Sequence, residues 1–382
     1  MRWDYGFFIE SDIKIFTMRV FSKNFKLHWK LFDGGIFSIF LILVGVGLLS
    51  MGGIGEATDV FFQRQLVFLG VAVSFILALS FFDYRILKNY SFTSLAIYSL
   101  TLVLLLASLV SSSVRGINAW ITIGPLRLEP SELAKLAVII LLAKYFSQKH
   151  VEIYKAHHII VSGFYAGLPA FLVLIQPDLG SAFIFFAIWL SMLLAAGIKR
   201  KHLLIIFLAS VVLCSVAWFS FLEPYQKSRI SSFLNPYLDP RGEGYSIIQS
   251  RVAIGSGWFW GNGLGKGTQS KLGYLPEAHT DFAFASYAEQ FGFIGIAGLF
   301  SALAYFLFRA GKIGFGARNN FAKLFSVGLI AFIFTHVMIN AGMNMGLLPV
   351  TGIPFPFLSY GGSFLITLSL GIGLLESIRI RS

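Results

Sequence analysis

Ten long apolar stretches dominate the sequence and leave few folds open to it. Most have about 17 to 25 residues, the length that a helix needs to cross a hydrocarbon layer about 30 Å thick. Of the 382 residues, 56% are hydrophobic and only 13% are charged, which excludes a single soluble core. The sequence predicts an all-α polytopic membrane protein with ten transmembrane helices, at residues 32–52, 65–82, 90–110, 130–147, 159–175, 180–197, 202–222, 281–309, 321–341 and 364–379.

The chain is predicted to be one membrane domain, 32–382, preceded by a short cytoplasmic segment, 1–31. The first 30 residues interleave apolar and charged residues, so we expect no cleavable signal peptide and insertion through internal helices. The longest connection, 223–280, joins the seventh and eighth predicted helices. It is therefore expected to form a long loop on the outer side.

The distribution of Lys and Arg among the loops predicts the orientation. If both termini are cytoplasmic, the cytoplasmic segments hold 20 of the 30 basic residues, the opposite face holds nine, and Lys135 lies inside a helix. This asymmetry favours a multi-pass protein of the cytoplasmic membrane with both termini inside. The net charge of +12 then reflects topology and anionic lipid headgroups, and no nucleic-acid partner is expected.

Cysteine and histidine offer little for redox or metal chemistry. The single cysteine, Cys214, excludes a disulfide within the chain. Among the seven histidines, His157 and His158 are adjacent and so face different sides of a helix, and His336 is alone in its helix. A haem or structural zinc site is therefore not expected.

The stretch "PLRLEPSELAKLAVII" contains unusual charges at the start of a predicted membrane helix. Glu132 and Lys135 are three residues apart, so they share a helix face and can form an ion pair, with Arg127 just above them. One interpretation is a structural salt bridge and helix cap. The other is an anion-binding cavity on the outer side, which would explain the cost of placing a lysine among apolar residues.

Two further segments on the outer side are candidates for the same cavity. In the short turn "QPDLGS", Asp178 either caps the following helix or points toward Lys135 and Arg127. In "GMNMGLLPVTGIPFPFLSYGGS", three prolines and a glycine pair exclude a regular helix. Irregular backbone at membrane depth is tolerated where it is buried in protein or lines a cavity, so this segment also indicates an outward-facing pocket.

The 223–280 connection combines an amphipathic stretch, aromatic residues and glycines. Ile247, Ile248, Val252, Ala253 and Ile254 form one broad apolar side of a predicted helix in the headgroup layer, and Gln249 lies on its polar side. Trp258, Phe259 and Trp260 suit an interfacial aromatic belt or stacking on sugars. "GNGLGKGT" is not a nucleotide-binding loop, because Gly267 stands where that motif requires Ser or Thr.

Asp281 stands where the long connection becomes the eighth predicted helix, in "PEAHTDFAFA". Either it caps that helix, or it is a general base for a substrate delivered along the membrane, since partial desolvation raises a carboxyl pKa toward neutrality. Glu289, eight residues further on, is expected to be a buried structural carboxyl.

Six ordered motifs, "EPSELAK", "QPDLGS", "GYSIIQSRVAIGSG", "GKGTQS", "LPEAHTDF" and "GLLPVTGIPFPFLSYGGS", resemble the SEDS family (shape, elongation, division and sporulation) from about residue 31 to the C terminus. The resemblance implies a peptidoglycan glycosyltransferase that polymerises lipid II on the outer face of the cytoplasmic membrane. "GTQS" and "PVTGIP" resemble the rod-shape branch more than the division branch, which implies a role in elongation.

The family's essential aspartate falls on Asp281, and its other important polar positions fall on Arg127, Glu132, Lys135 and Asp178. We add Gln249 to the substrate-binding candidates. The resemblance also implies a class B penicillin-binding transpeptidase and the elongation machinery as partners, with a divalent cation as a candidate cofactor. Two departures are notable: "KLFDGG" lacks the tryptophan often found beside its aspartate, and Gln290 replaces an acid.

Three alternatives stay open at this point. The same helices and polar cavity could serve a lipid II flippase or transporter. The chain could also be a scaffold for the transpeptidase, or a division-specific polymerase.

Overall fold

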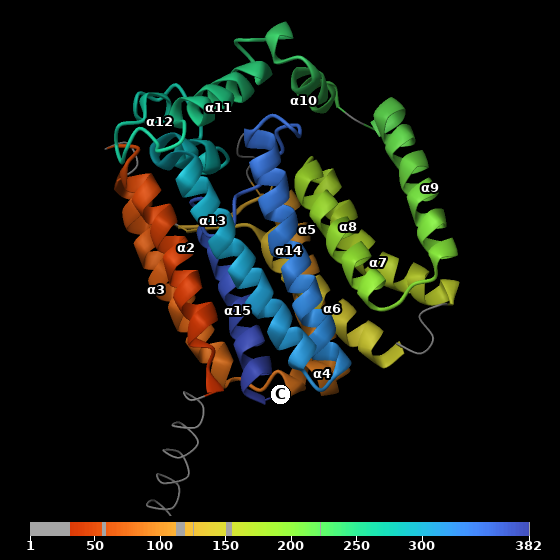
Figure 1. The fold of residues 1–382 in the computed structure, drawn as a ribbon. Coiled ribbons are helices and arrows are strands. Elements are labelled where there is room, and N and C mark those ends of the chain that lie inside the picture. The colour runs from red at the N-terminus through yellow and green to blue at the C-terminus, as the bar shows by residue number, and fades with distance from the viewer. Residues whose placement is uncertain are drawn as a thin grey trace, which may run out of the picture.

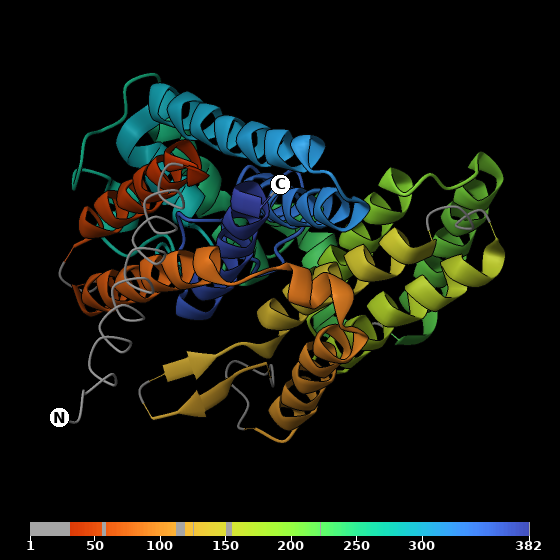
Figure 2. The same ribbon diagram turned by 90° about the horizontal axis from the view of Figure 1, so that it is seen from below.

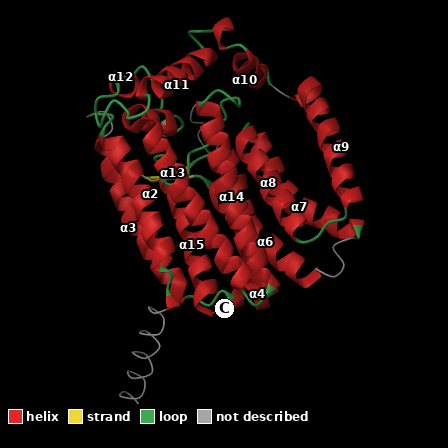
Figure 3. Ribbon diagram, viewed as in Figure 1, coloured by secondary structure: helices red, strands yellow, loops and turns green. Residues whose placement is uncertain are grey.

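The computed structural model describes residues 31–55, 59–111, 119–124, 126–149, 155–221 and 223–381, so the predicted N-terminal segment lies almost wholly outside the described residues. Helices dominate the structure (Figure 3). The long ones are α2 (Gly34–Gly52), α3 (Asp59–Phe81), α5 (Ser91–Leu109), α6 (Pro130–Lys149), α7 (Ala156–Ile175), α8 (Leu179–Ala195), α9 (Arg200–Val216), α13 (Ala283–Gly316), α14 (Asn320–Asn344) and α15 (Gly362–Arg381).

The predicted class, an all-α polytopic membrane protein, is confirmed. Eight described helices are long and apolar enough to cross a membrane. Of the other two long helices, α8 is apolar but has only 17 residues, and α6 carries four charged residues. The number of ten spans therefore stays a prediction. The predicted helix at 65–82 begins earlier, at Asp59, and the one at 281–309 continues to Gly316.

The centre of the bundle is formed by α6, α14 and α15, which are buried along most of their length (Figure 1). Helices that are apolar on every side are expected in such a position, since no face needs water. In contrast, α9 stands apart at the edge of the bundle, and its most apolar part has no buried residue. It continues into a π-helical turn, η2 (Ala217–Phe221).

The predicted loop 223–280 is largely helical. It contains α10 (Pro224–Leu234), η3 (Pro236–Leu238), α11 (Glu243–Gly257) and α12 (Thr268–Lys271), which cover one end of the bundle (Figure 1). We call this the capped end, and the opposite end, where α15 finishes, the C-terminal end. The predicted amphipathic helix is α11; its Ile247 and Ala253 are buried, whereas Val252 is 44% exposed.

The glycine-rich stretch after α11 packs its backbone against the first turns of α13. Asn262 N–H donates to Glu289 C=O, and Gly263 N–H donates to Gln290 C=O. A Cβ on Gly261 would lie only 2.2 Å from Gln290 O, and Gly292 has φ +62° within α13. Both positions therefore require glycine, which explains these glycines without a phosphate ligand.

A short hairpin that the sequence analysis missed precedes α6. The strands β1 (Ile121–Ile123) and β2 (Leu126–Leu128) pair antiparallel, with Thr122 opposite Arg127. Figure 2 shows the hairpin projecting beside the end of α5. Its second strand leads directly into the charged first turn of α6.

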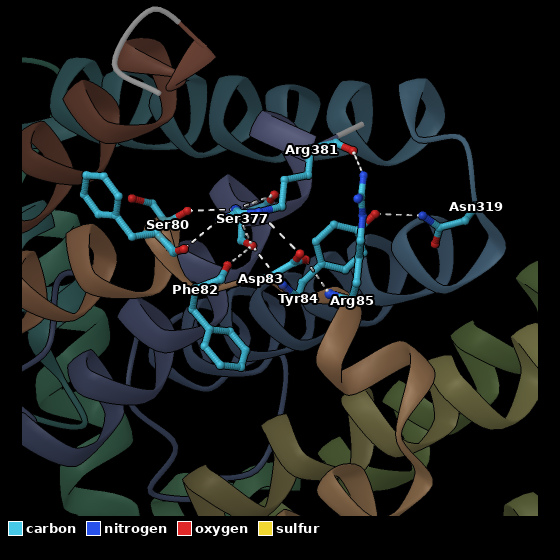
Figure 4. Close-up of polar contacts among 9 residues, drawn as sticks. Ser80, Phe82, Asp83, Tyr84, Arg85, Asn319, Ser377 and Arg381 are labelled. Carbon is cyan, nitrogen blue, oxygen red and sulfur yellow. Dashed lines mark hydrogen bonds and ion pairs between the residues drawn. The ribbon is translucent and has the colours of Figure 1, made fainter. Parts of the chain in front are cut away.

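At the C-terminal end, the last turn of α15 is tied to the link between α3 and the short α4 (Arg85–Asn89) (Figure 4). The Ser377 hydroxyl donates to Phe82 C=O at 2.5 Å and accepts from Tyr84 N–H at 3.2 Å. The Arg381 guanidinium donates to the carbonyls of Ser80 and Phe81, at 3.0 and 2.6 Å. These bonds satisfy backbone groups that the ends of α3 and α4 leave open.

We expect Ser377→Ala to lower the free energy of unfolding by about 1–3 kcal/mol, because two buried backbone groups lose their partner. Equilibrium unfolding in detergent micelles measures this change. The control is Ser369→Ala on the same helix, where the buried hydroxyl donates to Ile366 C=O of its own helix and has no other hydrogen bond in the part of the chain that the structure describes. Equal effects of the two substitutions would contradict a specific role of Ser377 at this junction.

Candidate active site

The first turns of α6 carry a buried ion pair. Lys135 Nζ donates to Glu132 Oε1 at 2.8 Å, and the two side chains are 0% and 1% exposed. Their spacing on one helix face produces the contact, as predicted. The Lys135 ammonium also lies 6.0 Å from the centre of the Phe332 ring of α14.

The other oxygen of Glu132 faces a histidine. Glu132 Oε2 lies 3.9 Å from His336 Nε2, and among the described residues neither atom has a hydrogen-bond partner. His336 Nδ1 lies 3.2 Å from Pro354 O, so Nδ1 carries the proton and donates to that carbonyl. If the imidazole is neutral, the lone pair of Nε2 faces the Glu132 carboxyl. The two groups then repel each other when Glu132 is ionised, and not when it is protonated. His336 thus joins the Glu132–Lys135 pair, although the sequence analysis considered it only as a metal ligand.

Asp281 lies in the turn before α13, and its backbone is held by two amides of α14. Asn340 Nδ2 and Asn344 Nδ2 donate to Asp281 C=O, at 2.9 and 3.0 Å. The N-cap of α13 is Phe282, with no side-chain cap, so the structure does not support the helix-capping interpretation of Asp281. The amide bonds fix the backbone of Asp281 without using its carboxylate.

The irregular segment 345–361 brings the two groups together, as its prolines and glycines suggested. A Cβ on Gly352, where φ is +75°, would lie 3.7 Å from Asp281 Oδ2. The next carbonyl, that of Ile353, accepts from Asn340 at 2.7 Å, and the one after it, that of Pro354, accepts from His336. Three consecutive residues therefore contact the Asp281 region, Asn340 and the histidine beside Glu132.

Asp178 caps α8, since its Oδ1 accepts from Ser181 N–H at 2.9 Å. The capping interpretation is confirmed, and the carboxylate also interacts electrostatically with Glu129 and Glu132. Gly180, two residues after Asp178, packs tightly against Thr351 and Ile353 of the irregular segment. Asp178 therefore belongs to the same polar group as the α6 pair.

Glu129, which the sequence analysis did not select, precedes α6. Its carboxyl accepts from Ser131 Oγ at 2.9 Å, and its N–H donates to Ser363 Oγ of α15 at 3.1 Å. Burial, followed by repulsion from Glu132, raises the pKa of Glu129 from 4.5 to about 8, although Lys135 opposes the shift. Glu129 is therefore mostly neutral at pH 7 and does not repel an anion.

The raised pKa of Glu129 predicts a pH dependence. Between pH 4.5 and about 8 the folded protein binds a proton here that the unfolded chain releases, so the contribution of Glu129 to stability is greatest below pH 4.5 and declines as pH rises through this window. We expect Glu129→Gln to flatten the decline in unfolding temperature measured from pH 5 to 9. Asp59→Asn, which removes an exposed carboxyl of α3, should keep the wild-type slope. An unchanged slope in Glu129→Gln would contradict the assignment.

The side chains of Arg127 and Gln249 make fewer contacts with the α6 pair than the sequence analysis predicted. Arg127 is exposed on β2, and its backbone carbonyl accepts from Ser363 Oγ at 2.9 Å. Gln249 is half-buried on α11, beside Ser250, whose hydroxyl donates to Asn344 C=O. Within the described ranges, neither side chain bonds to Glu132, Lys135 or Asp178. Their roles stay predictions.

The structure also shows the surroundings of Glu289 and Gln290, which both lie on α13. Glu289 is fully buried and accepts from Ser270 Oγ and from the N–H groups of Gln269 and Ser270, so it is structural, as expected. Gln290 Nε2 donates to Ser50 C=O of α2. The described part of the chain contains no group of three or more His, Cys, Asp or Glu that could hold a metal ion.

The sequence carried a signal for the residues that were missed. His336, Asn340 and Asn344 recur every four residues, so they lie on one face of α14. Two amides and an imidazole on one face of a membrane helix indicate a shared set of polar partners.

The comparison with known proteins decides the family. The sequence model of the FtsW/RodA/SpoVE family, described as a cell cycle protein, matches residues 25–382. The chain belongs to the SEDS family.

SEDS relatives from several bacteria resemble most of the chain. Stage V sporulation protein E of Bacillus subtilis is 36% identical over 89% of this chain and 94% of its own length. The probable peptidoglycan glycosyltransferase FtsW of Buchnera aphidicola is 37% identical, over 92% and 95%. The peptidoglycan glycosyltransferase MrdB of Escherichia coli K12 is 36% identical, over 74% and 76%.

Solved SEDS structures share the fold. A chain of a peptidoglycan synthase complex that coordinates polymerization and crosslinking superposes with a TM-score of 0.79 at 29% identity, covering 91% of this chain and 97% of that one. The rod-shape-determining protein RodA of Thermus thermophilus superposes with a TM-score of 0.69 at 26% identity, covering 91% and 96%. The resemblance noted in the sequence is thus confirmed.

Proposed function

We propose that this SEDS protein is a peptidoglycan glycosyltransferase that polymerises lipid II into β-1,4 glycan strands on the outer face of the cytoplasmic membrane. The proposal is supported by the family and by the names of its relatives. The observation that carries it is the geometry of α14, which holds the backbone of Asp281 and contacts the buried Glu132–Lys135 pair through His336.

In the proposed reaction, the Asp281 carboxylate takes the proton of the GlcNAc 4-hydroxyl of one lipid-linked disaccharide. The hydroxyl oxygen attacks C1 of the MurNAc of the other, and the bond from C1 to undecaprenyl pyrophosphate breaks. One displacement at an α-linked carbon inverts its configuration and gives a β-1,4 bond without a covalent enzyme intermediate. The Asp281 carboxyl releases its proton to solvent before the next cycle.

The departing diphosphate needs positive charge in a site that excludes water. Lys135, oriented by Glu132, and Arg127 on β2 are the proposed source, with Asp178 and Gln249 as further substrate-binding candidates. A neutral Glu129 would add no further negative charge beside Lys135 at pH 7. A divalent cation stays a candidate cofactor, but no step is assigned to it, because the described residues do not form a metal-binding group on their own.

The capped end faces outward in this proposal, and both termini are cytoplasmic. The support is the excess of Lys and Arg in the loops of the C-terminal end. We also propose a role in cell elongation, favoured by "GTQS" and "PVTGIP", with a class B penicillin-binding transpeptidase as partner. The similarity to a chain of a peptidoglycan synthase complex supports such a partner.

A gel assay of purified lipid II tests the function. We expect glycan strands when the full chain is reconstituted with a class B transpeptidase whose crosslinking is blocked by a β-lactam. A parallel assay of fluorescent lipid II movement across vesicles separates the alternatives. Transport without polymerisation would favour a flippase, and the absence of both activities would favour a scaffold.

A further inference from the structure

A cleft of about 890 Å³ opens at the C-terminal end of the bundle, far from the capped end that contains Asp281. The last turns of α13 form most of its wall, with contributions from the start of α2, from α14 and from the end of α15. No step of the proposed reaction uses this cleft.

Basic side chains exceed acids in the cleft. Arg309, Lys312 and Arg379 line it, together with one acid, Asp33. A second carboxyl, that of Glu376, lies just behind and accepts from the Asp33 N–H at 3.0 Å. Even with both acids ionised, the cations are in excess by three to two.

The acid in the cleft is already engaged. Asp33 Oδ1 caps α2 by accepting from Gly35 N–H and Ile36 N–H, and it also accepts from the Arg309 guanidinium. Arg379 Nε lies 3.9 Å from Asp33 Oδ2. Among the described residues, Arg309 Nε has no hydrogen-bond partner, and Lys312 makes no ion pair. Arg309 Nε is buried, but the exposed Lys312 and the half-exposed Arg379 retain donors for a further anion.

The remaining wall is apolar and open to the side. Phe308 and Phe315 of α13 are 68% and 87% exposed, and Ile330 of α14 also lines the cleft. At the end of a membrane helix, such side chains contact acyl chains. Phosphate-binding cations beside an exposed apolar wall match an amphiphile better than a soluble anion.

We propose that this cleft binds an anionic phospholipid of the leaflet at the C-terminal end. The headgroup phosphate would accept hydrogen bonds from Lys312, Arg379 and Arg309, while the acyl chains pack on Phe308 and Phe315. In the orientation proposed above, this is the cytoplasmic leaflet, whose negative surface attracts basic segments.

Native mass spectrometry of the full chain, delipidated and then supplied with phosphatidylglycerol or phosphatidylcholine, tests the proposal. We expect selective retention of phosphatidylglycerol. Each cation near an anionic lipid surface strengthens binding by about fivefold, so the double variant Lys312→Gln/Arg379→Gln should weaken it by about 30-fold. The control Arg318→Gln/Lys323→Gln removes the same charge from exposed positions outside the cleft and should retain the lipid.

A second pair of variants tests the cleft without changing charge. Gly311 lines it, so Gly311→Leu should reduce lipid retention, whereas Gly298→Leu on an open face of α13 should not. Equal retention of the two lipids, an equal effect of the two double variants, or displacement of the lipid by millimolar inorganic phosphate would each overturn the proposal. The binding readout is independent of glycan synthesis, so failure of one proposal leaves the other intact.

Discussion

Asp281→Asn is expected to reduce lipid II polymerisation at least 100-fold, because an amide cannot accept the hydroxyl proton in the transition state and general bases typically contribute about 10²–10⁴. The substitution is nearly isosteric. Asn340 and Asn344 hold the backbone carbonyl of residue 281, so their hydrogen bonds should survive the change. The gel assay of chain growth described above measures the loss.

The control for this prediction is Asp59→Asn, which removes an exposed carboxylate near the same end of the molecule and should leave polymerisation unchanged. Both variants should unfold at the wild-type temperature and retain bound lipid II. Normal chain growth by Asp281→Asn would refute the role of this carboxylate as the base, and with it the proposed reaction.

The second large effect concerns the stability of the α6 pair. Lys135→Met should lower the free energy of unfolding by about 3–5 kcal/mol, because the fully buried Glu132 would be left without its counter-ion. Equilibrium unfolding in mixed micelles measures this loss. The double variant Glu132→Gln/Lys135→Met should recover most of it, since no uncompensated charge remains.

Lys144 offers a matched control on the same helix. It is also buried, but its ammonium has no hydrogen-bond partner among the described residues. Lys144→Met leaves no charge without its counter-ion, so it should not lower the free energy of unfolding. If Lys135→Met also failed to lower the free energy of unfolding, the ion pair would contribute little to the fold, and the position of Lys135 would need another explanation.

Features that depend on local pattern could be predicted from the sequence. The apolar runs located the membrane helices, and the spacing of Glu132 and Lys135 predicted their contact. The prolines and glycines of 345–361 indicated irregular backbone at depth. The predicted ends of the helices were less accurate. The helix α3 begins at Asp59, six residues before the expected 65, because the polar residues of its first turns resemble a loop sequence.

Contacts between distant segments could not be predicted. Asp281 and Gly352 are 71 positions apart, and only the packing of α13 against α14 brings them together. The spacing of Asn340 and Asn344 places them on one face of α14, but their acceptor, Asp281 C=O, lies 59 and 63 positions away in the sequence. The hairpin before α6 was missed because two three-residue strands give too short a pattern beside the long apolar runs.

The polar side chains of α14 form one rigid row that contacts both parts of the site. His336 and Asn344 are eight residues apart, which fixes about 12 Å along the helix axis. A helix can tilt or rotate as a rigid body, but it does not stretch, so a partner that displaces α14 would shift the amides at Asp281 and the imidazole beside Glu132 together. The non-helical backbone at Gly352, Ile353 and Pro354 contacts Asp281, Asn340 and His336, so a displacement of α14 would reach both parts of the site through this short segment as well.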